Sequence, residues 1–159
     1  MKIKTILMFP LVFIIIFGGI AVADVFGMWQ TESSKVPMII KDGEFAGEYD
    51  PADIRGSYSF LDIENAYGVP SEITAKAFGL TSDDPGAIKA KDLEAIYGET
   101  NNGLEVGTGS IRSFIAYYIG MDYESDDGIP QQAVDILREE GKWSSELDTL
   151  YEGKIIDLS

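Results

Sequence analysis

The sequence predicts a mainly α-helical protein, in which an N-terminal transmembrane helix precedes a small bundle of short helices and a minor two-stranded β element is allowed. Three observations predict this class. Residues 5–23 form a run of 19 residues without a charge. After this run, apolar residues recur at helical spacing in short segments, most of which end at a glycine. The chain has neither cysteine nor histidine, so its fold cannot depend on disulfides or on zinc held by thiolates.

The N-terminal run is long enough to cross a bilayer. As a helix it spans about 28 Å, which is close to the thickness of the hydrocarbon core. Lys2 and Lys4 precede the run, and lysines in this position stay on the cytoplasmic side. We therefore expect a single-pass protein of the cell membrane that enters the lipid bilayer through residues 5–23, with its C-terminal domain outside. The alternative is a secretory signal that is cleaved between Ala23 and Asp24, at a small-x-small site, and releases a secreted protein.

Three regions are predicted along the chain. Residues 1–29 form the membrane anchor or signal segment, residues 30–52 form a linker and extended segment, and residues 53–159 form an exported, acidic helical domain. Within the linker, the apolar residues 36–40 predict an edge strand, because Pro37 cannot donate a hydrogen bond to a ladder.

The helical domain begins with two short helices, predicted over residues 60–67 and 71–78. Each has a polar residue that can cap its N-terminus and a glycine that can end it. Together they predict a compact helical hairpin, which we interpret as a packing unit rather than a DNA reader, because residues 53–80 contain two basic side chains. The residues that carry these signals are Ser59 and Gly68 for the first helix, and Ser71 and Gly79 for the second.

Further helices are predicted from the same kind of signal. The segments are residues 89–97, a helix that follows a cap at Ser110 and ends before Gly120, a helix from Pro130 to Gly141, and a last turn or two from Ser144 or Ser145 to Glu152. The chain then ends in the apolar residues 154–158. These residues could pair with residues 36–40 and so form the minor β element.

Two of the predicted helices have similar seven-residue sequences. Residues 62–68 read Asp-Ile-Glu-Asn-Ala-Tyr-Gly, and residues 92–98 read Asp-Leu-Glu-Ala-Ile-Tyr-Gly, so five of the seven positions are identical or conservative. A duplicated helical hairpin would produce this pattern, and so would chance similarity between two capped helices. The sequence leaves both explanations open.

Composition excludes several classes of function. The chain carries 27 acidic and 12 basic residues, a formal net charge of −15, and such a chain repels phosphate backbones, so we expect no nucleic-acid binding. It lacks the thiolate nucleophile and the imidazole base that act near neutral pH. Paired carboxylates can hydrolyse glycosides, but among 27 acids some pair always has a suitable separation. We therefore expect no enzyme activity, no catalytic residue and no cofactor.

One acidic loop is a candidate cation site. Residues 122–128 place oxygen ligands at alternate positions, as calcium prefers, and the candidate ligands are Asp122, Glu124 and Asp126. The loop departs from an EF-hand, because its sixth position is not glycine and its twelfth is not glutamate. The alternative is an ordinary acidic loop before Pro130.

Two arginines occupy similar positions in the sequence. Arg55 and Arg112 each follow an isoleucine at the entry to a predicted helical segment. Arginine can hold a carboxylate or a phosphate in a bidentate fork. In so acidic a chain, we expect both side chains to form internal ion pairs instead.

One segment supports a resemblance to known proteins. The segment from Asp53 to Phe60 reads Asp-Ile-Arg-Gly-Ser-Tyr-Ser-Phe, and Asp-Ile at 62–63 and Tyr-Gly-Val-Pro at 67–70 follow it. This stretch resembles a small helical module of membrane-anchored proteins in anaerobic archaea and bacteria, which lies attached to or beside ferredoxin-type electron-transfer membrane proteins. The likeness covers residues 53–80, with a looser echo at residues 129–142. Because the chain has no cysteine, the resemblance implies an accessory or docking role near a membrane redox system and transfers no catalytic residue.

These observations predict a non-enzymatic, extracytoplasmic interaction domain on a membrane anchor. We expect a membrane protein partner with a basic face, in a redox or transport complex, because the acidic surface would attract such a face. The alternative is a secreted module that binds a solute or a cation.

Overall fold

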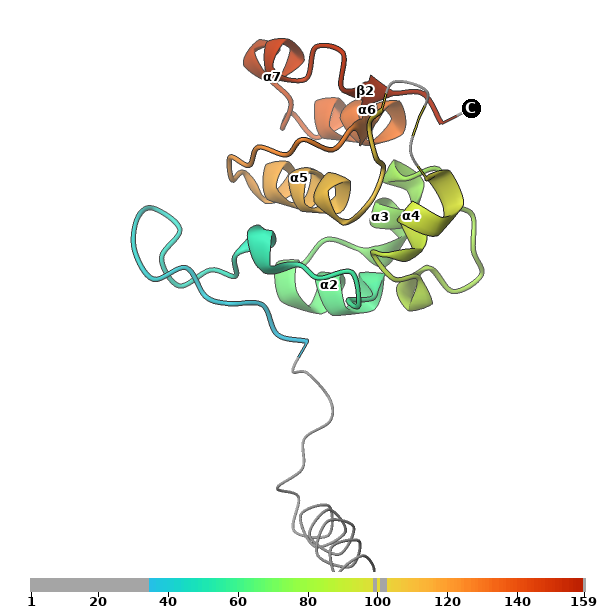
Figure 1. Ribbon diagram of the computed structural model, residues 1–159. Helices are drawn as coiled ribbons and strands as arrows, with labels where there is room; N and C mark the ends of the chain where they lie inside the picture. The colour runs from blue at the N-terminus through green and yellow to red at the C-terminus, as the bar shows by residue number, and fades with distance from the viewer. Residues whose placement is uncertain (1–34, 99, 101–102, 159) are drawn as a thin grey trace, which may run out of the picture. The chain divides into compact units, whose positions relative to one another are not determined.

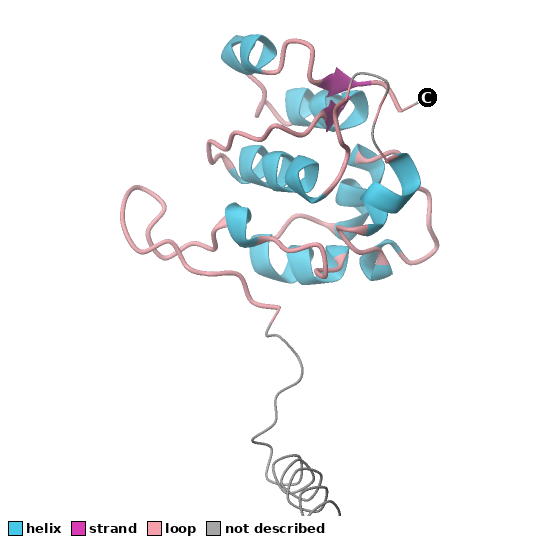
Figure 2. Ribbon diagram, viewed as in Figure 1, coloured by secondary structure: helices cyan, strands magenta, loops and turns pink. Residues whose placement is uncertain are grey.

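The computed structural model describes residues 35–98, 100 and 103–158. The described part is mainly helical, with six α-helices and a small two-stranded sheet (Figure 1; Figure 2). The helices are α2 (Phe60–Tyr67), α3 (Ser71–Ala77), α4 (Asp92–Tyr97), α5 (Thr108–Ile119), α6 (Gln131–Glu139) and α7 (Ser145–Leu150), the 3₁₀ turns are η1 (Pro51–Asp53) and η2 (Pro85–Ala87), and the strands are β1 (Ile129–Pro130) and β2 (Ile155–Ile156).

The membrane prediction concerns residues that the structure does not describe. Among the described residues, no helix has the length and apolar character needed to cross a membrane. The predicted spanning residues 5–23 lie outside the described residues. The compact unit begins at Lys35, so it includes part of the region that the sequence assigns to a linker.

Helix α5 lies at the centre of the domain. It contacts η1, α6 and β1, and α2 and α7 lie toward opposite ends of the domain (Figure 1). Phe114 in α5 is fully buried, and its ring meets the Phe78 ring edge-on, with 6.0 Å between the ring centroids. One hydrophobic core therefore extends from the α2–α3 hairpin to the C-terminal strand.

The first predicted hairpin forms, and its first cap is the one that the sequence predicts. The backbone N–H and the hydroxyl of Ser59 donate to Asp62 Oδ2 at 2.8 and 2.7 Å, and the N–H of Asp62 donates back to Ser59 Oγ. Gly68 ends α2 at φ 72°, a conformation that favours glycine. The prediction for Ser71 is wrong: Pro70 takes the N-cap position, and the Ser71 N–H and hydroxyl donate to Glu64 of the preceding helix.

Two other predicted helix starts are also wrong. Helix α5 begins at Thr108 with Gly107 as its N-cap, and the Ser110 hydroxyl accepts a bond from the Gly107 N–H instead of capping the helix itself. Helix α4 begins at Asp92 rather than near Lys89, because Lys89 forms an isolated antiparallel bridge with the chain just before α2. A contact outside the helix thus accompanies the later start of α4, whereas the start of α5 is fixed by a bond within its own first turn.

The antiparallel bridge between Ser59 and Lys89 joins the residues that precede the two similar sequences 62–68 and 92–98. The Phe60 N–H donates to the Ile88 carbonyl at 2.8 Å, and the Ala90 N–H donates to the Tyr58 carbonyl at 2.9 Å. A shift of thirty residues converts one bond into the other, so a local two-fold axis passes through the bridge.

Close packing extends this local symmetry. A Cβ atom at Gly56 would lie 3.1 Å from Lys91 Cβ, and a Cβ atom at Gly86 would lie 3.3 Å from Leu61 Cβ. These two contacts are again related by a shift of thirty residues. The symmetry does not extend to a second hairpin, because residues 103–107, which lie thirty positions after the later part of α3, form no helix. The structure therefore leaves both explanations of the similar sequences open.

The predicted pairing of the C-terminus is wrong. Residues 155–156 pair in parallel with Ile129 and Pro130, not with residues 36–40. Ile129 is fully buried beside α6, so pairing there adds apolar surface to the core. In the segment 36–40, Ile39 instead forms an antiparallel bridge with Tyr49.

The capping box predicts a measurable loss of stability in Asp62→Asn. The neutral amide loses the charge-assisted bonds from Ser59 and Lys35, and loss of such a cap typically costs about 0.5–2 kcal/mol. Burial raises the pKa of Asp62, but the hydrogen bonds from Lys35 and Ser59 outweigh it and leave the pKa lowered. The stabilisation is therefore complete above the ordinary value of 3.8 and disappears as the pH falls through the lowered pKa of the folded state.

Urea unfolding at pH 7 and at pH 3 measures this effect. Asp92→Asn is the matched control, because Asp92 holds the corresponding place in the second copy and accepts a bond from the Lys89 N–H. We expect the larger loss for Asp62→Asn at pH 7 and a smaller difference from the wild type at pH 3. Equal stability of Asp62→Asn and the wild type at pH 7 would contradict the role of the capping box.

Candidate docking surface

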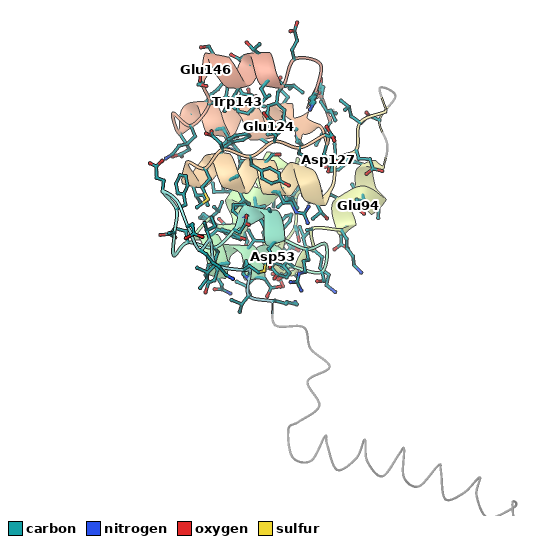
Figure 3. The ribbon with its side chains drawn as sticks, turned by 60° about the vertical axis from the view of Figure 1, so that its left-hand side comes forward. Asp53, Glu94, Glu124, Asp127, Trp143 and Glu146 are labelled. Carbon is teal, nitrogen blue, oxygen red and sulfur yellow. The ribbon has the colours of Figure 1, made fainter. Side chains whose placement is uncertain are left out.

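Exposed carboxylates concentrate in the C-terminal part of the domain. Residues 122–157 contain eleven acidic and three basic side chains, and ten of the eleven acidic residues are exposed. Figure 3 shows Glu124, Asp127 and Glu146 on one side of the molecule, from α7 to the loop before β1. We call residues 122–127 together with α7 the acidic surface.

A cavity opens within the acidic surface. Its volume is about 230 Å³. Leu150 and Tyr151 supply apolar lining, and Glu124 and Asp126 supply negative charge. Lys154 also lines the cavity and donates to the Ser125 carbonyl at 3.0 Å, which ties the loop to the segment before β2. The cavity thus combines an apolar wall with exposed carboxylates, an arrangement that suits a cationic side chain with an aliphatic stem.

An aromatic cluster lies next to this cavity and includes Tyr151, which also lines it. The rings of Tyr117, Trp143 and Tyr151 contact one another, with centroid separations of 5.5 to 6.0 Å. The Tyr117 hydroxyl donates to the Tyr123 carbonyl, which holds the acidic loop against α5. Burial raises the pKa of Tyr117 well above its ordinary value, and its contact with Tyr151 adds to the effect. The hydroxyl therefore stays protonated and keeps its donor role throughout the physiological range.

Helix α7 is fixed by charged contacts of its own. Asp148 accepts a bond from Trp143 Nε1 at 2.8 Å and one from Arg138 Nη2 at 2.6 Å. The hydrogen bond from Trp143 and then the bond from Arg138 lower the pKa of Asp148. The carboxylate therefore remains charged at neutral pH and links α6 to α7.

The structure separates the three candidate calcium ligands from a common centre. Glu124 and Asp126 line the cavity, whereas Asp122 does not, and Asp126 lies 4.0 Å from the Lys154 ammonium group. Within the described part of the chain, no group of three or more acidic side chains is arranged to hold a metal ion. Calcium binding by this loop stays a prediction of the sequence.

The two arginines have different partners. Arg55 Nη2 lies 3.2 Å from Asp53 Oδ1, so the predicted ion pair is confirmed. Arg112 instead donates from Nε and Nη2 to the Ile54 carbonyl, at 2.8 and 2.6 Å. Its partner is a backbone group because α5 packs directly against η1 and the segment that follows.

Sequence reasoning did not identify every residue of the cavity. The acidic run at residues 122–127 was visible, but nothing in the sequence places Leu150, Tyr151 and Lys154 beside it. Tyr151 lines the cavity although it is only 1% exposed, because it also packs into the hydrophobic core. The meeting of these segments depends on the parallel pairing of β1 with β2, which the sequence did not predict.

Comparison of the chain with protein-family models, with curated proteins and with solved structures found no match. The geometry of the domain and the chemistry of its surface are therefore the basis for a functional proposal.

Proposed function

We propose that the protein is a membrane-anchored, extracytoplasmic interaction domain without enzyme activity, which docks through its acidic surface onto a basic face of a membrane protein partner. The observation that carries the proposal is the concentration of exposed carboxylates around the cavity at residues 122–127 and α7. These residues carry six carboxylates and no basic side chain, a formal net charge of −6. Such a field attracts a partner of opposite charge and raises the rate of association at low ionic strength.

The membrane anchor in this proposal strengthens weak contacts. A domain that is tethered beside its partner meets it at an effective concentration that can reach the millimolar range. Modest affinity between an acidic and a basic face is then sufficient. The resemblance of residues 53–80 to the module found beside ferredoxin-type membrane proteins supports a redox complex as the partner, with a transport complex as the other candidate.

Charge reversal at the cavity tests the proposal. A C-terminally tagged full-length chain is purified from gently solubilised native membranes, and its partners are identified by mass spectrometry. The Glu124→Lys/Asp126→Lys double variant should recover at least about tenfold less partner, because two attractive charge contacts become repulsive. Recovery of the wild-type complex should also fall as salt is raised from about 0.05 to 0.3 M, because screening lengths shorten over this range.

A matched control separates this surface from the general charge of the chain. Glu72 and Asp83 are exposed and line a different cavity beside α3, so Glu72→Lys/Asp83→Lys changes the net charge equally elsewhere. We expect this variant to retain its partner. Equal losses in both variants would contradict docking at the acidic surface. A wild-type chain that begins at Asp24 and is purified without a partner would contradict the membrane anchor. Calcium-dependent thermal stabilisation in that released chain would favour a cation-binding module instead.

A further inference from the structure

A second surface of the domain has a different character from the acidic one. Val36, Met38 and Ile39 are 57%, 63% and 55% exposed, so three large apolar side chains within four positions lie in solvent. Other exposed large apolar side chains of the described residues, such as Ile96 and Leu150, lie on separate helices. We call residues 36–49 the apolar hairpin.

The apolar hairpin is held in a defined conformation. The Asp50 N–H donates to the Met38 carbonyl at 2.8 Å, and the Ile40 N–H donates to the Glu48 carbonyl at 2.9 Å. These bonds join its two arms. The exposed side chains are therefore presented by a hydrogen-bonded hairpin rather than by a loose tail.

The base of the hairpin is fixed to the helical domain. The Met38 N–H donates to Asp53 Oδ2 at 2.9 Å, and the Tyr49 ring packs edge-on against the Tyr67 ring of α2. Lys35 forms an ion pair with Asp62 at 2.9 Å, while Pro37 is buried. Lys35, Pro37 and Tyr49 thus attach the hairpin to the domain, while the apolar side chains of Val36, Met38 and Ile39 remain exposed.

The position of the hairpin in the chain and in the domain indicates what covers it. Eleven residues separate Ala23, the end of the uncharged run, from Lys35, and a fully extended segment of this length reaches at most about 40 Å. The hairpin lies near the α2 end of the domain, whereas α7 of the acidic surface lies toward the other end (Figure 1). If residues 5–23 are in a bilayer, the hairpin lies at the end of the domain from which the chain leads to that bilayer.

Charge and area favour lipid over protein as the occupant. Residues 35–50 carry four acidic and two basic side chains, a net of −2 over sixteen residues, against −8 over the thirty-six residues 122–157. Lipid phosphates therefore repel the hairpin segment less than the C-terminal segment. Three side chains offer far less than the roughly 800 Å² per partner that a standard protein interface buries. Small apolar elements beside an anchor are nevertheless sufficient for an interfacial contact, because the anchor supplies the affinity.

We propose that the apolar hairpin rests on the outer surface of the bilayer, with Val36, Met38 and Ile39 in the interfacial region. This contact orients the domain so that its acidic surface faces away from the lipid and toward the partner. The proposal rests on the membrane anchor of the proposed function. It goes beyond that function by assigning a second, lipid-binding surface.

Single-cysteine labelling of the full chain tests this contact, and the chain suits the method because it has no native cysteine. Met38→Cys carries a spin label, and the protein is reconstituted into phosphatidylcholine vesicles. Collisions with oxygen, which partitions into lipid, are compared with collisions with a water-soluble nickel chelate. Ile96→Cys is the matched control, because Ile96 is 54% exposed on α4.

We expect the oxygen-to-nickel collision ratio at position 38 to exceed that at position 96 by at least about threefold in vesicles, because an interfacial side chain is screened from water. The same ratio at both positions, in protein that floats with the vesicles, overturns the lipid contact and leaves the anchor intact. Protein that does not float overturns the anchor and this contact together. A label that is shielded from both reagents shows a protein occupant, such as a second copy, and also overturns the proposal.

Discussion

The Phe114→Ala variant should unfold about 3–5 kcal/mol more readily than the wild-type protein, as is typical when a buried phenylalanine is truncated. Phe114 is fully buried at the centre of α5. Its ring contacts the Phe78 ring from the α2–α3 hairpin and the Tyr118 ring one turn along α5, at centroid separations of 6.0 and 5.7 Å. The variant therefore loses apolar burial and leaves a cavity between two parts of the core that the sequence places far apart.

Urea unfolding followed by circular dichroism measures the loss. Phe45→Ala is the control, because Phe45 is a half-buried phenylalanine in the apolar hairpin rather than in the core. We expect that variant to lose less than about 1 kcal/mol, as is usual for substitutions outside a packed core. A loss of this small size at Phe114 would contradict the central place of α5 in the domain. Partner recovery by Phe114→Ala should fall only in proportion to the unfolded fraction, because Phe114 is buried and does not line the cavity of the acidic surface.

Local signals predicted most of the helices correctly. Gly68, Gly98 and Gly120 each occupy the C-cap position after the helix that the sequence ends there. Ser144, one of the two serines predicted for this role, caps the last helix, and its hydroxyl accepts a bond from the Leu147 N–H. These signals succeed because a cap and a helix stop depend on residues within one or two turns of each other.

Two of the errors concern the residue at which a helix begins. Ser71 and Ser110 have the chemistry of a cap, but Ser71 lies inside its helix because the preceding Pro70 already occupies the N-cap position. Ser110 lies three residues after Gly107, where its hydroxyl accepts from that residue's N–H. No local pattern distinguishes these positions from a cap, because the course of the preceding loop sets the first residue of each helix.

The candidate docking surface could likewise be predicted only in part from the sequence. The acidic run at residues 122–127 and its exposure follow from composition alone, since so many carboxylates cannot be buried. The cavity does not follow from composition, because it requires the parallel pairing of β1 with β2 to bring Lys154 and Tyr151 to the loop. Pairing between segments twenty-six residues apart depends on the whole core, and two-residue strands carry almost no pattern of their own.

Gly128→Ala should destabilise the protein by about 1–3 kcal/mol, the usual cost of forcing an extra methyl group into a packed site. A Cβ atom at this position would overlap the side chain of Ile156 and lie 3.2 Å from the Lys154 carbonyl oxygen. That carbonyl accepts the Ile129 N–H bond that begins the β1–β2 pairing. The methyl group therefore pushes β2 away from β1, and with it Lys154, which lines the cavity of the acidic surface.

Gly109→Ala is the control for this substitution. A Cβ atom there would meet the Asp127 carboxylate and, at 2.8 Å, the Ser125 hydroxyl, which are the ends of two side chains that can turn aside. The added methyl group also suits the first turn of α5. Because both side chains belong to the acidic surface, this variant is a control for stability alone. We expect Gly109→Ala to retain the stability of the wild type and Gly128→Ala to lose both stability and partner recovery. If Gly128→Ala were as stable as Gly109→Ala and still lost its partner, the pairing of β1 with β2 would position the docking surface without stabilising the fold. If Gly128→Ala kept both its stability and its partner recovery, the close approach of β2 to Gly128 would be needed neither for the fold nor for docking.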